Sequence, residues 1–242
     1  MSSFTPRPSQ TEILRYTSSH LGISAVPGSG KTHVLSALAA QIIHSGVLQD
    51  GQEVLIVTLV NSAVDNFEAR IKGFFDNPLQ ALYKYRVRTL HGLAHDVVRE
   101  KPARVGLEER FAILDEREAD FIRRDAANAW LASHPDFLED YLDPALDDSR
   151  RDWVRRKQLP ELIGSLCLAF IRSAKDRRLT PEIVRVKLDA APAALPLAEL
   201  GWSIYADYQR ALAYRGAVDF DDLIRLALDL LESDSEYLER LR

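Results

Sequence analysis

A glycine-rich segment, residues 25–32 (Ala-Val-Pro-Gly-Ser-Gly-Lys-Thr), constrains the fold of this chain more than any other feature. The apolar run at residues 21–25 precedes it as a short strand would, and a helical pattern over residues 34–40 follows it directly. Gly28 and Gly30 allow the tight turn in which successive backbone N–H groups face phosphate oxygens. The order of strand, glycine loop and helix therefore predicts a phosphate-binding loop.

The same loop ends in residues whose chemistry suits a nucleoside triphosphate. The Lys31 ammonium supplies a positive charge to the outer phosphates, and the Thr32 hydroxyl is a ligand for Mg²⁺. Motifs of this kind usually open with Gly, where this chain has Ala25, so Gly28 and the final Gly-Lys-Thr are the strict matches. The alternative is a glycine-rich turn before a helix, but the flanking patterns favour the nucleotide site.

Length and composition place the chain among ordinary globular proteins. Its 242 residues fit one large domain or two smaller ones, and 46% of them are hydrophobic, which is enough for a core. Cys167 is the only cysteine, so an intramolecular disulfide is impossible and a reducing compartment is indicated. Apolar runs are shorter than the roughly 18 residues of a membrane span, so we expect a cytoplasmic protein without a membrane contact.

The net charge of −5 is unevenly distributed along the chain. Residues 110–148 hold eleven Asp and Glu against four Arg, whereas residues 150–187 hold eleven Lys and Arg against four Asp and Glu. Such an asymmetry suits a phosphate-contacting face beside an acidic one. It suits equally well two halves of a helical subdomain that neutralise each other, and the sequence leaves both interpretations open.

Three short apolar segments, at residues 21–25, 54–59 and 87–89, are predicted to be parallel strands, because each is followed by a helical pattern. The β-branched run at residues 54–58 has the composition of a strand covered on both faces. We therefore expect an α/β fold whose mostly parallel sheet carries helices on both faces. A nucleotide would bind at the carboxyl ends of the strands.

Near residue 106 the strand patterns end and amphipathic helices dominate, among them residues 110–114 and 119–122. Two more helices are predicted over residues 200–214 and 220–231, and prolines mark the breaks between the helical segments. The predicted organisation has three parts: the first part of the α/β domain (1–105), an all-helical subdomain (106–196) and a return to the α/β domain (197–242).

Several segments point to one family when they are taken in order. They are Gln10 upstream of the loop, T-L-V-N-S-A-V-D-N-F-E-A-R-I at residues 58–71, T-L-H-G-L-A at 89–94, I-R-S-A-K-D-R-R-L-T-P-E at 171–182, Y-A-D-Y-Q at 205–209 and D-F-D-D-L-I at 219–224. Together with the loop, they resemble the superfamily 1 DNA helicases of the UvrD/Rep/PcrA group. In residues 58–71 the chain departs from the family pattern at Ser62, where Lys is usual, and at Asn66 and Phe67, where Glu and Met are usual.

The resemblance implies a P-loop NTPase (RecA-like) domain, called 1A, with a helical subdomain, 1B. It implies ATP-driven movement along single-stranded DNA with duplex separation in the 3′ to 5′ direction. By resemblance, Gln10 would contact adenine, Thr32 would bind Mg²⁺, and the phosphates would be held by Gly28, Ser29, Gly30 and Lys31. Ala25 and His33 are further residues that it implies for nucleotide binding. It also implies contacts to single-stranded DNA from Thr58, Asn61, Thr89 and His91, and contacts to duplex DNA from Lys175 and Arg178.

The family's metal-binding acidic pair, a strand that ends in Asp-Glu, has no predicted counterpart here. We therefore expect an amino-terminal fragment of a helicase that binds ATP without efficient hydrolysis and works with the rest of 1A and the domains 2A and 2B. One alternative is that Asp219, Asp221 and Asp222 hold the metal instead. Two other functions also remain open, a non-catalytic module that binds nucleotide or DNA and, less favoured, a P-loop kinase with a helical lid.

Overall fold

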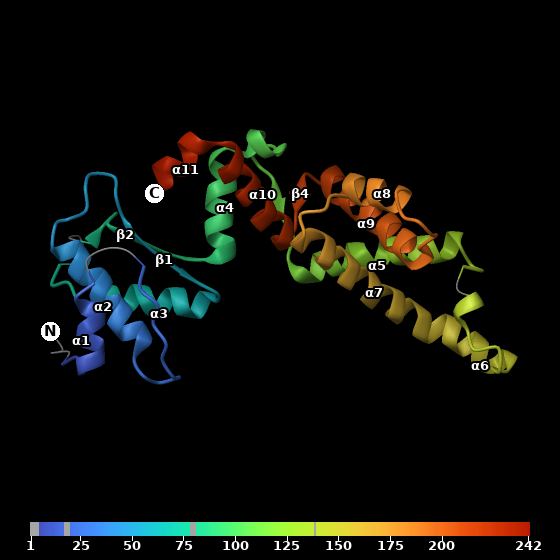
Figure 1. Cartoon of the computed structure of the whole chain (residues 1–242), viewed down its shortest axis with the longest axis horizontal. Helices are drawn as coiled ribbons and strands as arrows, with labels where there is room; N and C mark the ends of the chain where they lie inside the picture. Colours follow the sequence, from blue (N-terminus) through green and yellow to red (C-terminus); the bar gives the residue numbers. More distant parts are fainter. Residues whose placement is uncertain (1–4, 17–19, 78–80, 138) are drawn as a thin grey trace. The chain divides into compact units, whose positions relative to one another are not determined.

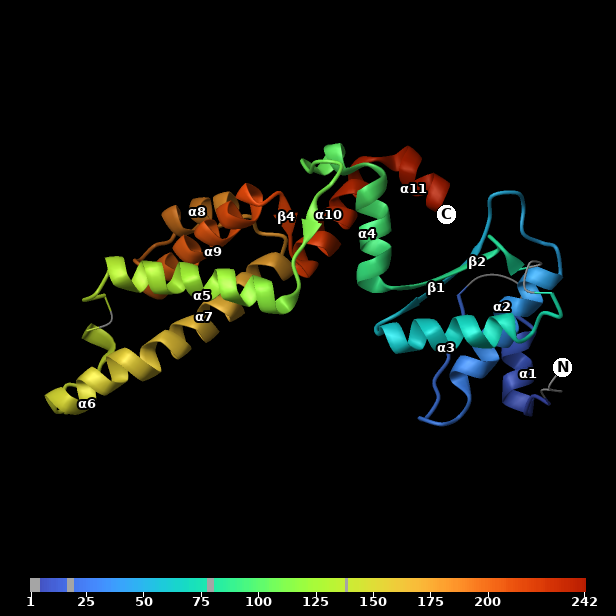
Figure 2. The same cartoon turned by 180° about the vertical axis from the view of Figure 1, so that it is seen from behind.

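A computed structural model of the chain describes residues 5–16, 20–77, 81–137 and 139–242 (Figures 1 and 2). The chain divides into two compact units, Met1–Leu93 and Ala94–Arg242. The first unit contains the glycine loop and a small parallel sheet, and the second is mostly helical. The three-part organisation with boundaries near residues 105 and 196 stays a prediction.

The described residues of the first unit form two strands and three helices, followed by the start of a fourth helix. The elements of this unit are α1 (Pro8–Leu14), α2 (Lys31–His44), β1 (Val54–Thr58), α3 (Asn61–Lys72) and β2 (Tyr85–Thr89), after which α4 (Leu90–Glu100) begins. β1 and β2 pair in parallel, in a register that runs from Val54 opposite Tyr85 to Thr58 opposite Thr89. The core lies where α2 and α3 pack on this pair, around Phe67, Ile71 and Val87 in particular.

The strand predicted at residues 21–25 is not present, and this prediction is wrong. Residues 20–26 have no regular secondary structure, and within the described residues no backbone hydrogen bond joins this segment to β1 or β2. A strand is held by the ladder that it forms with a neighbour, so an apolar run without such a neighbour stays irregular. The prediction for residues 54–59 is confirmed apart from its last residue, and β2 begins two residues earlier than predicted.

In the described part of the first unit, helices cover one face of the β1–β2 pair, not both faces as predicted. Val54 and Ile56 pack against the core that α2 and α3 form. Leu55 and Val57 point the other way, and each is 45% exposed. Alternate residues of a strand point to opposite faces, so the β-branched composition of the run could not tell which face is covered.

The second unit consists mainly of packed helices. After α4 its elements are η2 (Pro102–Val105), β3 (Ala112–Ile113), α5 (Glu116–Ser133), η3 (Glu139–Tyr141), α6 (Asp148–Trp153), the π-helical η4 (Val154–Gln158), α7 (Leu159–Asp176), α8 (Pro181–Asp189), α9 (Pro196–Tyr214), β4 (Ala217–Val218), α10 (Phe220–Ser233) and α11 (Ser235–Leu241). The helices α5, α7 and α9 pack against one another and enclose the buried side chains of Ile171, Ile204 and Tyr208.

The helix predicted over residues 110–114 is absent, because two of these residues form β3, which pairs in parallel with β4. The prediction rested on local hydrophobic periodicity, whereas the pairing partner of β3 lies about a hundred residues away in the sequence. The helices predicted over 200–214 and 220–231 are confirmed as α9 and α10. No described helix is long and apolar enough to cross a membrane.

Candidate nucleotide site and strand edge

The loop before α2 adopts a conformation that its two glycines make possible. Gly28 and Gly30 have φ angles of 78° and 91°, a region that residues with a Cβ atom rarely adopt. Gly30 is also the N-cap of α2. A Cβ atom at this position would lie 3.3 Å from the side-chain nitrogen of Gln10, so Gly30 also leaves room for that side chain.

Lys31 reaches back over the loop from the first position of α2. Its Nζ atom donates hydrogen bonds to the backbone oxygens of Ala25, at 2.6 Å, and of Val26, at 3.1 Å. The Ser29 hydroxyl oxygen is buried and has no hydrogen-bond partner within the described residues. The loop therefore combines a cationic donor with a hydroxyl group whose hydrogen-bonding capacity is unused.

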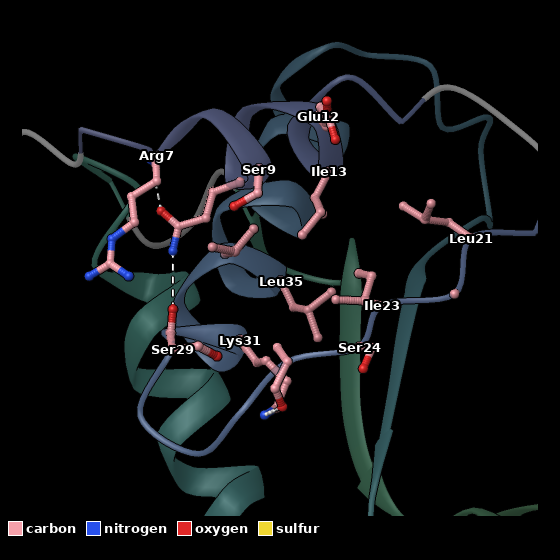
Figure 3. A pocket seen from close by; sticks show the side chains of 14 residues that line it. Arg7, Ser9, Glu12, Ile13, Leu21, Ile23, Ser24, Ser29, Lys31 and Leu35 are labelled. Carbon is pink, nitrogen blue, oxygen red and sulfur yellow. Dashed lines mark hydrogen bonds between the residues drawn. The ribbon is translucent and has the colours of Figure 1, made fainter.

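Gln10 connects α1 with the loop (Figure 3). Its Oε1 atom accepts a hydrogen bond from the backbone N–H of Arg7, at 2.9 Å, and its Nε2 atom donates one to the Ser29 carbonyl, at 3.2 Å. These two bonds fix which end of the amide carries the oxygen. A primary amide has a second lone pair on its oxygen and a second N–H, so both ends keep capacity for a ligand.

A cavity of about 340 Å³ lies between α1, residues 21–25 and the start of α2 (Figure 3). Its volume is within the range of small-molecule and cofactor sites. It is lined by residues from all three segments, namely Arg7, Ser9, Gln10, Glu12, Ile13, Leu21, Gly22, Ile23, Ser24, Ala25, Ser29, Lys31, Val34 and Leu35.

The cavity brings together four of the residues predicted to bind nucleotide: Gln10, Ala25, Ser29 and Lys31. The others, Gly28, Gly30, Thr32 and His33, are not part of its lining. His33 instead lies against the second half of α3 and the residues that follow it, where its Nδ1 is 3.2 Å from Nη1 of Arg70 and its ring centroid is 5.5 Å from that of Phe74.

Sequence reasoning missed Arg7 and Glu12, the two charged lining residues from the α1 region. Arg7 is three positions before Gln10, and residues three apart share one face of a helix, so this spacing was the available signal for Arg7. Glu12 is two positions after Gln10, and that spacing gives no such signal. The aliphatic wall was also missed, because residues 21–25 were predicted to be a buried strand.

The four residues predicted to border single-stranded DNA lie at one edge of the small sheet. Thr58 and Thr89 are opposite each other at the carboxyl ends of β1 and β2. Asn61 is the first residue of α3, and His91 lies in the first turn of α4. The Thr89 hydroxyl accepts a hydrogen bond from the backbone N–H of Gly92, at 3.0 Å, and so caps that turn.

Residues 7–242 match the family described as UvrD/REP helicase N-terminal domain. The chain belongs to this family. It is similar to a probable DNA helicase II homolog of Rickettsia conorii, with 29% identity over 236 residues, which are 97% of this chain and 31% of the relative. It is also similar to the ATP-dependent DNA helicase PcrA of Staphylococcus epidermidis, with 27% identity over 231 residues, which are 95% of this chain and 27% of that protein. The chain thus spans about a third of the length of these relatives or less.

Membership of the UvrD/REP family implies a P-loop NTPase fold, with which the parallel β1–β2 pair and the glycine loop are compatible. Helicase, ATP-binding and DNA-binding are the functional descriptions that the family and the relatives' names carry.

Lys175, a predicted contact to duplex DNA, is buried in the second unit, and this prediction is wrong. Its side chain is 1% exposed, and its Nζ atom lies 2.5 Å from Asp219 and 2.8 Å from Asp222. The Tyr208 hydroxyl donates a further hydrogen bond to Asp219, at 2.6 Å. An ammonium group that two carboxylates hold inside the protein cannot reach a phosphate backbone.

The same cluster argues against the alternative that Asp219, Asp221 and Asp222 bind a metal ion. Burial alone would raise the pKa of Asp219, but the charge of Lys175 and hydrogen bonds from Lys175 and Tyr208 hold it below its ordinary value. The positive charge beside Asp219 and Asp222 is therefore supplied by Lys175, together with Arg225, which lies 3.5 Å from Asp222. Within the described residues, no group of three or more His, Cys, Asp or Glu side chains is arranged to hold a metal ion.

Most of the basic stretch at residues 150–187 is engaged by carboxylates of the second unit. Arg178 pairs with Asp229, at 2.5 Å, and with Glu232, at 2.6 Å. The remaining pairs include Arg155 with Glu139, Arg172 with Glu116 and Arg185 with Glu199. These pairs favour the first of two interpretations, in which acidic and basic residues neutralise each other. They argue against the second, in which the basic residues form a continuous phosphate-contacting face.

One Asp-Glu pair does follow a strand, contrary to the sequence analysis. Asp115 and Glu116 come just after β3, but both have structural roles in the second unit. The Asp115 side chain caps α5 by accepting hydrogen bonds from the backbone N–H groups of Arg117 and Glu118. Glu116 binds Arg123 and Arg172.

Proposed function

We propose that this chain is the ATP-binding and single-strand-binding part of an ATP-dependent 3′ to 5′ DNA helicase that acts in DNA repair or recombination. The observation that carries the proposal is the cavity at which Lys31, Ser29 and Gln10 meet beside a loop with two left-handed glycines. Family membership supports it, as do the names of the helicase relatives.

The donors around the cavity fit a nucleoside triphosphate. Lys31 would exchange the carbonyls of Ala25 and Val26 for phosphate oxygens, and Ser29 and the loop N–H groups would add hydrogen bonds. Gln10 would bond the edge of adenine with its unused donor and acceptor. Thr32, next to Lys31 at the start of α2, would hold Mg²⁺, which would neutralise charge on the phosphates.

Binding without efficient hydrolysis is the second part of the proposal. Hydrolysis needs a carboxylate near the outer phosphates to position the water and the metal ion. Glu12 is the only carboxylate among the described residues that line the cavity, and Figure 3 shows it away from Lys31, toward the opposite end. The remaining helicase domains would supply the missing groups.

Single-stranded DNA would lie along the edge formed by Thr58, Asn61, Thr89 and His91. Hydroxyl, amide and imidazole groups near two helix N-termini suit phosphate and sugar contacts. We do not propose Lys175 or Arg178 as contacts to duplex DNA, because Lys175 is buried and Arg178 is engaged in ion pairs. The division into 1A (1–105 and 197–242) and 1B (106–196) remains part of the proposal.

Replacement of Lys31 tests the nucleotide site. We expect the variant Lys31→Ala to lose measurable ATP binding in calorimetry, because the neutral side chain gives no charge to the phosphates, and to keep the helical content of the parent in circular dichroism. The matched control is Lys72→Ala, since Lys72 is an exposed lysine of the same unit whose ion-pair partner is Glu68. An ATP affinity in Lys31→Ala equal to that of the control would refute the assignment of the loop.

A further inference from the structure

Arg7 brings a second planar polar group to the cavity that Gln10 lines. It is the N-cap residue of α1, and the bond from its own backbone N–H to the Gln10 side chain holds the two residues in one helical turn. The residue is exposed, and within the described residues its guanidinium group has no hydrogen bond or ion pair. Figure 3 shows this guanidinium group beyond the Gln10 amide, on the side away from Leu21 and Ile23. Exposed side chains change rotamer within nanoseconds, so Arg7 can turn toward a base that Gln10 holds.

Apart from Arg7 and Gln10, the lining of the cavity has few flat groups on which a nucleotide base could stack. The side chains of Ile13, Leu21 and Ile23 are aliphatic, and no described residue of the lining is aromatic. A purine face is usually covered by an aromatic ring or by the plane of an arginine. Of the charged lining residues, Lys31 is a point charge and Glu12 an anion, so Arg7 alone combines a positive charge with a flat, delocalised face.

We propose that Arg7 is a nucleotide-binding residue whose guanidinium plane lies against the adenine face while Gln10 bonds the adenine edge. This assignment rests on the proposed function, because it takes the ligand to be ATP. In this arrangement Lys31 and the loop hold the phosphates, and Arg7 and Gln10, whose side chain bonds the Ser29 carbonyl of that loop, hold the base beside them.

The test separates base recognition from charge attraction. ATP and inorganic tripolyphosphate, which lacks a base, are titrated by calorimetry into the unaltered chain, Arg7→Ala and Arg7→Lys. We expect Arg7→Ala to weaken ATP binding about five- to tenfold and Arg7→Lys to weaken it nearly as much, because lysine keeps the charge but not the plane. The affinity for tripolyphosphate should stay within twofold of the parent.

Arg15→Ala is the matched control, since Arg15 is an exposed arginine at the other end of α1 and does not line the cavity. The proposal is overturned if Arg7→Ala binds ATP as tightly as this control. It is also overturned if Arg7→Ala loses tripolyphosphate affinity by the same factor as ATP affinity, which would make Arg7 a phosphate contact. Failure of the unaltered chain to bind ATP would instead refute the proposed function itself, and the role of Arg7 with it.

Discussion

Lys175 shows that the sequence around a residue does not always predict whether its side chain is exposed or buried. It stands in a run of basic residues, and that context indicates an exposed, phosphate-binding side chain. Its partners Asp219 and Asp222 lie more than forty positions further along the chain, so the pairing depends on how α7, α9 and α10 pack. By contrast, the tight turn at Gly28 and Gly30 could be predicted from sequence, because it depends on residues within the same loop. The role of this loop in nucleotide binding stays a prediction.

We expect Lys175→Met to lower the free energy of unfolding by about 3–5 kcal/mol, since it removes the ammonium group that both buried carboxylates contact and leaves Arg225, 3.5 Å from Asp222, as the remaining ion-pair partner of the two. Urea denaturation followed by circular dichroism measures the change. Lys187→Met serves as the control, because Lys187 is exposed on α8, and its effect should stay within about 0.5 kcal/mol. Equal midpoints for the two variants would show that the buried ion pairs do not stabilise this unit.

At the scale of elements, long helices could be predicted well and short strands poorly. The periodicity of α9 and α10 extends over several turns, so it identifies a helix without knowledge of the rest of the protein. β3 has two residues, and its partner β4 is remote in sequence, so local pattern pointed to a helix instead. Residues 21–25 show the opposite error, since an apolar run without a pairing neighbour was predicted to be a strand.

The close approach of α7 and α9 can be tested at Gly201. A Cβ atom there would lie 2.7 Å from the Phe170 ring, so the ring must move in Gly201→Ala. We expect this variant to lose about 1–2 kcal/mol of stability in urea denaturation, even after the gain in helix propensity.

Gly164 on α7 provides a matched comparison, because a Cβ atom there meets no other atom within 4 Å. Gly164→Ala should be neutral or more stable by up to about 1 kcal/mol. If Gly201→Ala were also stabilising, this would contradict the close approach of α7 and α9 at Gly201.

At the scale of the whole molecule, the order of motifs identified the family correctly, because it reflects the linear sequence rather than packing. Residues 7–242 match the UvrD/REP helicase N-terminal domain. The cavity could be predicted only in part, since Gln10 and Lys31 belong to recognisable motifs whereas Arg7, Glu12 and the aliphatic wall depend on how α1 folds beside residues 21–25. The central claim is that the first unit carries separate ATP and single-strand sites.

Hydrogen exchange followed by mass spectrometry tests this claim most directly, on the unaltered chain alone, with ATP and Mg²⁺, and with a single-stranded oligonucleotide. We predict that ATP protects backbone amides at residues 7–14 and 25–34, and that the oligonucleotide protects residues 58–62 and 89–92. The helices α5, α7 and α9 should exchange equally in all three samples. Protection by ATP in those helices, or saturating ATP without protection of the loop, would contradict the account.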